Sequence, residues 1–142
     1  MMMTSIDPKA QAILNERFHH DCLIALATEE DHRPFVRTVN AYYEYGAFYV
    51  ITHALSRKMQ QIEKNPRVAV SGDWFTAQGV GENQGHILKA ENARMAAILR
   101  AAFAAWYQNG HINEADENTC ILRIRLEKGT LFSHGTRYDL EF

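Results

Sequence analysis

Short apolar runs separated by turn residues dominate the hydrophobic pattern of the chain. Each run has three to nine residues, many of them β-branched or aromatic, and most are bounded by Gly, Pro, Asn or Asp, as is typical of strands. These runs lie at residues 22–27, 35–43, 47–52, 67–71, 74–81, 120–126 and 130–132. The pattern predicts a small closed sheet with helices at its ends, which is a mainly β arrangement of the α+β class.

Three segments have helical signals instead. Residues 6–18 begin with Asp7-Pro8, which suits the first turn of a helix. A second helix starts at Ser56, a good N-cap, and stops at Asn65-Pro66, since a residue before proline avoids the α region. The segment 89–109 is predicted to be the longest helix and to end at Asn109-Gly110. Its apolar stripe consists of Met95, Ile98, Leu99, Ala102, Phe103 and Trp106.

The turns between the strands have signals of their own. Gly46 in Glu44-Tyr45-Gly46 is free to adopt positive φ, so it predicts a hairpin turn. Residues 29–34 predict a longer charged loop, and Lys128-Gly129 predicts a turn before residues 130–132. Gly79, Gly81 and Gly85 have no surrounding βαβ unit and indicate a bulge or a close backbone approach.

Composition narrows the class of protein. The chain has 142 residues, 46% of them apolar, which is enough for the core of one domain. A net charge of −2 and a pI near 6.4 do not call for nucleic acid or an anionic membrane surface. No run of about 18 apolar residues predicts a membrane span, and Met1–Ser5 do not resemble a signal peptide. We therefore expect a cytoplasmic protein with no nucleic-acid or membrane partner.

Cysteines and histidines give no metal signal. Cys22 and Cys120 lie in apolar runs, which favours buried free thiols, and they could form a disulfide only if their strands are neighbours. His19-His20 are adjacent, and adjacent side chains in a strand point to opposite faces. We expect no metal site.

The candidate chemistry lies between residues 35 and 66. Thr52 ends a strand, and Ser56, Arg57 and Lys58 open the next helix. The start of a helix has free N–H groups and a positive dipole end, which favour a phosphate group. Arg37, in a neighbouring apolar strand, needs a partner or must face solvent, and a phosphate or another anion is one such partner. The residues alone leave open a simpler interpretation, a capped helix with two exposed cations.

The same residues resemble the FMN-binding core of the pyridoxamine 5′-phosphate oxidase family. That family has an Arg-x-Val strand, then Thr-x-x-x-Ser-Arg-Lys, then a helix that ends in Asn-Pro. The corresponding segments here are Arg37-Thr38-Val39, Thr52-His53-Ala54-Leu55-Ser56-Arg57-Lys58 and Asn65-Pro66. Their order, spacing and expected secondary structure agree with the family over residues 20–85. At residue 32, a histidine stands where the family often has glycine.

The resemblance implies a single domain over residues 1–142. This domain would be a split β-barrel of about six strands with flanking helices, and it would form a homodimer with FMN at the subunit interface. The phosphate would contact Arg37, Ser56, Arg57 and Lys58, and the ring and ribityl chain would lie near Thr38, Val39, Asn40, Ile51 and Thr52. Gln78 either lies near the ring or is a polar residue on an exposed strand face.

The implied function is that of an FMN-dependent oxidoreductase acting on a small-molecule substrate or electron acceptor. Pyridoxamine phosphate oxidases of the family have a C-terminal segment with a tryptophan and arginines, and no such pattern follows Arg137. A flavin, nitro- or quinone-reducing activity, or a stress-related flavin binder, fits better than oxidation of pyridoxamine 5′-phosphate. No residue could be assigned a catalytic role.

The alternative is a split barrel that binds flavin, deazaflavin or haem without turnover. FMN and a deazaflavin both present a phosphate and a tricyclic ring, so the sequence cannot separate them. Haem would need an axial histidine, for which the candidates are His53, His86, His111 and His134.

Overall fold

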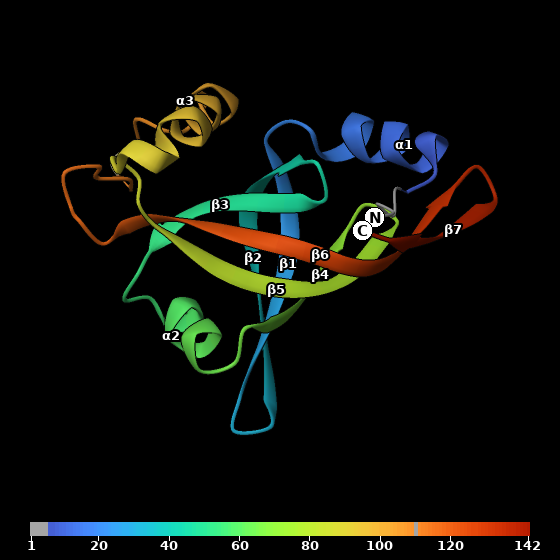
Figure 1. Ribbon diagram of the computed structural model, residues 1–142, viewed down its shortest axis with the longest axis horizontal. Coiled ribbons are helices and arrows are strands. Elements are labelled where there is room, and N and C mark those ends of the chain that lie inside the picture. Colours follow the sequence, from blue (N-terminus) through green and yellow to red (C-terminus); the bar gives the residue numbers. More distant parts are fainter. Residues whose placement is uncertain (1–5, 110) are drawn as a thin grey trace, which may run out of the picture.

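The computed structural model describes residues 6–109 and 111–142, and its centre is one antiparallel sheet that closes into a barrel (Figure 1). The strand order is β3-β2-β1-β4-β5-β6-β7, and a further pairing of β3 with β6 joins the ends of the six-stranded part. The strands are β1 (Cys22–Glu30), β2 (Arg33–Glu44), β3 (Ala47–His53), β4 (Arg67–Gly72), β5 (Phe75–His86), β6 (Thr119–Ser133) and β7 (Thr136–Glu141). The predicted split barrel of about six strands is confirmed.

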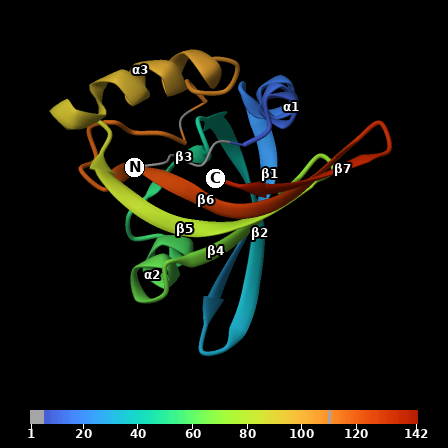
Figure 2. The same cartoon turned by 45° about the vertical axis from the view of Figure 1, so that its right-hand side comes forward.

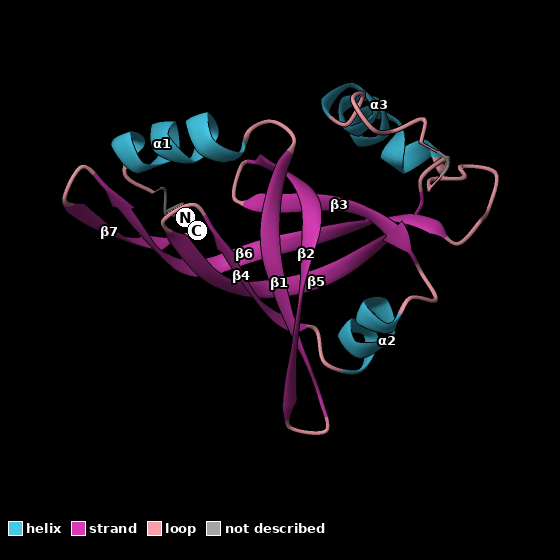
Figure 3. Ribbon diagram, turned by 180° about the vertical axis from the view of Figure 1, so that it is seen from behind, coloured by secondary structure: helices cyan, strands magenta, loops and turns pink. Residues whose placement is uncertain are grey.

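The barrel interior is filled by the inward-facing side chains, which are every second residue of each strand. Along β1, Ile24 and Leu26 are buried while Leu23 is exposed, the two-residue alternation of a half-covered strand. The largest side chains inside are aromatic, and Phe18, Phe48 and Phe75 contact one another at ring distances of 5.5–6.3 Å. Phe18 comes from α1 (Pro8–Phe18), which closes one end of the barrel (Figure 3).

Two further helices flank the barrel. The helix α2 (Arg57–Lys64) inserts Met59 and Ile62 into the same core from the other end, well away from α1 (Figure 2). The helix α3 (Ala93–Ala102) lies against the outside of β3 and β6 and forms a second cluster, in which Leu99 and Phe103 pack near Ile121.

The prediction of one long helix over residues 89–109 is wrong. A 3-10 turn at Ala90–Asn92 precedes α3, which has 10 residues and is followed by turns. Phe103 and Tyr107 continue the apolar stripe and are buried. Trp106, however, donates a hydrogen bond to Asp21, a contact that the apolar spacing cannot specify. The helix was predicted to end at Asn109-Gly110, but α3 ends at Ala102. Gly110 itself lies outside the described residues.

Three hairpins have two-residue turns with positive φ at both central residues, as right-handed strand twist requires. These turns are Asp31-His32, Tyr45-Gly46 and His134-Gly135. The predicted turn at Gly46 is confirmed. The longer loop predicted at 29–34 is wrong, because Glu30 pairs with Arg33 and the strands extend to the turn.

The turn predicted at Lys128-Gly129 is also wrong. Strand β6 runs through both residues, and Gly129 pairs with Ala77. A Cβ atom at Gly129 would lie 2.8 Å from the carbonyl oxygen of Thr76, so this glycine marks a close approach of two backbones. Beyond it the C-terminal segment forms β7, which pairs with β6.

Gly79 and Gly85 of β5 behave as predicted, since each lies at a register shift, whereas Gly81 approaches the side chain of Ile62 and not a backbone. The ladder to β6 shifts register between Gln78 and Gly79, which is a bulge. A Cβ atom at Gly79 would lie 2.3 Å from the carbonyl oxygen of Arg125.

Cys22 and Cys120 are free thiols on strands that do not pair with each other. Burial, with the Asp21 carboxylate, raises the pKa of the Cys22 thiol to about 12. Within the described part of the chain, none of the helices has the length and apolar character needed to cross a membrane. The expectation that there is no signal peptide concerns residues 1–5, which lie outside the described residues.

Candidate functional site

A cluster of cations lies where β3 ends and α2 begins. The loop between them, residues 54–56, is fixed by backbone hydrogen bonds from Ala54 to Asn118 and from Ser56 to His53. This loop leads into α2, which lies at the lower end of the barrel, beside the β1–β2 hairpin (Figure 1). Strand β2 of that hairpin carries Arg37 on its inward face, between Phe35 and Val39.

Lys58 reaches back from the first turn of α2 to the end of β3. Its Nζ atom donates a 2.8 Å hydrogen bond to the hydroxyl of Thr52. Burial lowers the pKa of Lys58, and the charge of Arg37 lowers it further. The ammonium group is thus half-buried and has no carboxylate among its described hydrogen-bond partners.

Arg37 is held by neutral groups. Its Nη1 atom donates to the carbonyl oxygen of Leu26 at 3.1 Å and to the hydroxyl of Thr28 at 2.8 Å. Its Nη2 atom donates to the side-chain carbonyl of Gln61 at 3.1 Å. Burial lowers the pKa of Arg37, and the charge of Arg57 adds to this effect. The expectation that Arg37 needs a partner is confirmed, but the sequence did not identify these neutral groups as its partners.

Arg57 is exposed and lies over the ring of Phe35, with its guanidinium carbon 4.8 Å from the ring centre. Its Nη2 atom is 3.5 Å from a carboxylate oxygen of Glu30, a pairing that water screens. A hydrogen bond from Gln61, followed by the charge of Arg57, holds the pKa of Glu30 below its usual value. Arg57 is therefore the most accessible of the three cations.

Ser56 is the N-cap of α2, but its side chain does not form the capping hydrogen bond. Its Oγ atom is buried and has no hydrogen-bond partner among the described residues. Buried hydroxyl groups nearly always have a partner, so this oxygen points to a missing one. An anion at the N-terminus of α2 would supply it, and the helix dipole favours the same charge.

The remaining predicted residues divide between other surroundings. Val39 packs at the edge of the barrel core, and Ile51 packs in the α3 cluster. The Asn40 side chain donates a 3.0 Å hydrogen bond to Asp21. Thr38 and Gln78 are exposed on the outer face of the sheet. Gln78 stands there in a row of residues that are paired across four neighbouring strands, namely Val36, Ala27, Ala69 and Gln78.

The structure therefore brings together Arg37, Thr52, Ser56, Arg57 and Lys58, and places Thr38, Asn40, Ile51 and Gln78 elsewhere on the barrel. The outer face carries an open groove of about 890 Å³. Small side chains line it, among them Ala25, Ala27, Ala69, Ser71 and Thr76. Val36 also lines the groove and is 70% exposed.

Sequence reasoning missed Thr28, Glu30 and Gln61, which surround Arg37 and Arg57. Thr28 and Gln61 are buried at 3% and 2% exposure. Thr28 ends an apolar run and Gln61 lies one residue before the buried Ile62, so both look like ordinary flanking polar residues in the sequence. Nothing in the one-dimensional pattern signals that a strand and a helix bring them to the same guanidinium.

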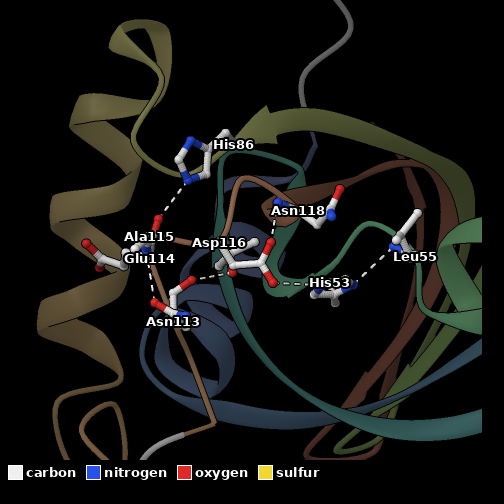
Figure 4. A network of polar contacts seen from close by, with 9 residues as sticks. His53, Leu55, His86, Asn113, Glu114, Ala115, Asp116 and Asn118 are labelled. Atoms are coloured by element: carbon white, nitrogen blue, oxygen red, sulfur yellow. Dashed lines mark hydrogen bonds and ion pairs between the residues drawn. The ribbon is translucent and has the colours of Figure 1, made fainter.

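His53 lies beside the cation cluster but belongs to a separate network (Figure 4). Its Nε2 atom is 3.0 Å from the Asp116 carboxylate, and its Nδ1 atom accepts the backbone N–H of Leu55. The pKa of Asp116 is lowered first by the backbone N–H of Asn118 and then by His53. Nearby, His86 donates to the carbonyl oxygen of Glu114. The network holds the loop 113–118 against the end of β3.

The chain matches the family model for pyridoxamine 5′-phosphate oxidase over residues 6–133. This match covers most of the chain, so the protein belongs to the pyridoxamine 5′-phosphate oxidase family. No curated protein sequence matches the chain significantly.

Solved structures share the fold at low sequence identity. A NimC/NimA family protein from Clostridium acetobutylicum has a TM-score of 0.68 at 19% identity, with 95% of each chain covered. A haem-binding protein from Mycobacterium smegmatis has a TM-score of 0.68 at 16% identity over 99% of this chain and 60% of its own. An FAD-binding protein from Mesorhizobium loti has a TM-score of 0.62 at 16% identity, over 83% of this chain and 90% of its own.

Proposed function

We propose that the protein is an FMN-binding flavoprotein that holds the phosphate of the cofactor at the start of α2. The observation that carries the proposal is the buried Ser56 hydroxyl without a described partner, next to Lys58 and Arg57. A phosphate oxygen at this place would accept a hydrogen bond from Ser56 and lie within the field of three cations.

The charge balance supports a phosphate ligand. Arg37 and Lys58 have neutral groups as their described hydrogen-bond partners, and the pKa of each is lowered by burial and by a neighbouring cation. Glu30 is the carboxylate that pairs with this group, through Arg57. Like charges held together without enough counter-charge are costly, and a phosphate dianion would relieve that cost.

The remaining cofactor contacts follow from the family resemblance. The ring and ribityl chain would extend from the cation cluster along β2 and β3, near Val39, Thr52 and the neighbouring residues Thr38, Asn40 and Ile51. Gln78 lies on the outer face of the sheet, where it would reach a ring bound between two subunits. The proposal therefore includes a homodimer in which the outer groove of each chain faces its partner.

The proposed activity is that of an oxidoreductase. FMN supplies electron or hydride transfer, and the protein supplies binding, orientation and electrostatics. The two free thiols suit a reducing compartment, so we place the protein in the cytoplasm.

A non-catalytic binder of flavin, deazaflavin or haem is the alternative. The fold similarity to a haem-binding protein is compatible with it. His53, however, uses both ring nitrogens in hydrogen bonds, and His86 uses Nε2. Ligation of haem iron by His53 would break one of these contacts, so the geometry argues against His53 as an axial ligand.

An absorbance spectrum of the purified protein, repeated after FMN is added and the excess removed, tests the cofactor class. We expect bands at ~450 and ~370 nm that stay with the protein, because bound flavin keeps its chromophore. A sharp Soret band would instead support haem. A colourless protein that does not retain added FMN would contradict the proposal.

The double variant Arg57→Ala/Lys58→Ala tests the place of binding. We expect it to lose most FMN affinity in a fluorescence titration while the far-UV circular dichroism stays unchanged, since Arg57 is exposed and Lys58 is half-buried. A matched control is Lys9→Ala/Arg137→Ala, which removes two exposed cations away from α2. Equal FMN affinity in the folded double variant and the control would rule out this phosphate site.

A further inference from the structure

We propose that Thr28 and Gln61 are positioning residues for the phosphate ligand, which act by fixing the guanidinium of Arg37, and that Glu30 fixes the orientation of Gln61. This inference rests on the proposed function, because it concerns how the same site holds a phosphate. It adds three residues that the sequence motif does not contain.

The contacts form a closed ring. Arg37 donates from Nη1 to the Thr28 hydroxyl and from Nη2 to the Gln61 carbonyl oxygen. The Thr28 hydroxyl, having accepted from Arg37, donates in turn to the same oxygen of Gln61. The guanidinium is thus held at two nitrogens, and the carbonyl oxygen of Leu26 adds a third acceptor. Rotation of the Arg37 side chain would break several bonds at once.

The orientation of the Gln61 amide follows from the chemistry of its neighbours. The Nε2 atom of Gln61 donates a 3.0 Å hydrogen bond to a carboxylate oxygen of Glu30. A carboxylate accepts hydrogen bonds and a guanidinium donates them. The amide nitrogen must therefore face Glu30 and the carbonyl must face Arg37, so Glu30 selects the amide orientation that binds Arg37.

Burial makes this ring rigid. Thr28 and Gln61 are 3% and 2% exposed, and they come from β1 and α2, two elements packed against each other. A buried polar group that loses its partner is costly, so the bonds persist in the folded protein. The side chain of Arg37, which would otherwise have many rotamers, is ordered before any ligand arrives.

The hydrogen-bond partners of Arg37 are uncharged, so its positive charge stays available for an anionic ligand. A carboxylate in the place of Gln61 would position the guanidinium equally well, but would cancel its charge. Three of the five N–H groups of Arg37 are used by partners among the described residues, so two remain to donate to an anion.

Glu30 also links the two arginines of the site. The carboxylate oxygen that accepts from Gln61 is also the one 3.5 Å from Arg57. One continuous chain of contacts thus runs from Arg37 through Thr28, Gln61 and Glu30 to Arg57. This chain connects the buried cation of β2 with the exposed cation of α2.

The test compares FMN with riboflavin, which lacks the phosphate. Thr28→Val and Gln61→Met remove the polar contacts with little change in volume. We expect each to weaken FMN binding about tenfold, as for the loss of hydrogen bonds to a charged group, and to leave riboflavin binding unchanged. Thr28→Ser keeps the hydroxyl and is expected to restore the wild-type preference for FMN.

A matched control is Tyr43→Phe, which removes a buried hydroxyl hydrogen-bonded to Gln11 and Gly46, next to α1. It is expected to lower stability without changing the ratio of the two affinities. If Thr28→Val or Gln61→Met fails to fold, the other variant decides the test.

The two proposals fail in different ways. A wild-type protein that binds FMN more tightly than riboflavin, with the same ratio in both variants, overturns the positioning role and leaves the phosphate site in place. A wild-type protein without any preference for FMN overturns the phosphate site and the positioning role together. Equal loss of FMN and riboflavin affinity would show that Thr28 and Gln61 serve only the fold.

Discussion

At the residue scale, the buried hydroxyl of Ser56 is the most informative atom of the candidate site. A serine at an N-cap normally accepts a hydrogen bond from the backbone two or three residues on, and Ser56 does not. The residue type thus fits its place in the helix, while the side chain is left available for a ligand. Sequence reasoning predicted the N-cap correctly and could not predict the missing bond.

We expect Ser56→Ala to separate binding from stability. The variant removes a buried oxygen that has no partner among the described residues, so the free energy of unfolding without ligand should rise by about 1 kcal/mol. FMN affinity should fall, because one phosphate contact is lost. Chemical denaturation and a fluorescence titration measure the two quantities. A less stable variant with unchanged FMN affinity would mean that Ser56 is a structural cap.

Arg37 shows the limit of residue-scale reasoning from sequence. Its position in an apolar strand correctly indicated that it needs a partner. The partners come from Leu26 and Thr28 on the neighbouring strand and from Gln61, 24 residues away on α2. The pairing of β1 with β2 and the docking of α2 create these contacts, and neither is encoded near Arg37.

At the element scale, the strands were predicted better than the helices and turns. Strand residues alternate between core and surface, so the pattern reports burial directly. Strand β6 was nevertheless divided at Gly129, because glycine marks both turns and close backbone approaches. The opposite strand decides between a turn and a close approach at Gly129, because its Thr76 carbonyl oxygen would meet a Cβ atom there.

The bulge in β5 also contains a glycine at a close backbone approach, Gly79, which can be tested by substitution. We expect Gly79→Ala to lower the free energy of unfolding by about 2 kcal/mol, the cost of overpacking, because its Cβ atom would lie 2.3 Å from the backbone oxygen of Arg125. The higher strand propensity of alanine, worth roughly 0.5–1 kcal/mol, is too small to compensate.

Gly81→Ala is the matched control for this prediction. Its Cβ atom would meet the side chain of Ile62 at 2.9 Å, and a side chain can move where a backbone cannot. The loss of stability should therefore be smaller than for Gly79→Ala. Urea denaturation of both variants measures the difference, and the reverse order would contradict the assignment of a rigid backbone contact.

At the scale of the whole molecule, barrel closure places the cation cluster at one end and the small-residue groove on the outer face. The pairing of β3 with β6 joins residues more than 60 positions apart in the chain, such as Thr52 and Cys120. This closure brings Thr52 to the end of the barrel that α2 covers. The groove lies on the other side of β1, β4 and β5.

We expect Val36→Arg to convert the proposed homodimer into a monomer and to weaken FMN binding at the same time. Val36 lines the groove and is 70% exposed, so a charged side chain should leave the folded monomer intact and oppose contact between two copies. Analytical ultracentrifugation and a flavin titration measure the two effects. Leu88→Arg, at an exposed apolar position outside the groove, is the control.

Two results would contradict this prediction. A Val36→Arg variant that remains dimeric would exclude the outer groove as the interface. A wild-type protein that is monomeric at micromolar concentration and still binds FMN would exclude a shared site altogether.

The sequence by itself determined the class of fold, most of the strand positions and the place of the cations at the start of α2. These features depend on residues close together in the chain: the alternation within a strand, the N-cap at Ser56, the stop at Asn65-Pro66 and the cations that follow Thr52. The family match and the closed barrel confirm the fold that they predicted.

The tertiary structure alone decided how the site is held. Thr28, Gln61 and Glu30 contact the arginines only because a strand and a helix meet at the end of the barrel. It also ended α3 at Ala102 and made the C-terminal segment into β7. These outcomes depend on hydrogen bonds and packing between residues that are distant in the chain, which no local pattern records.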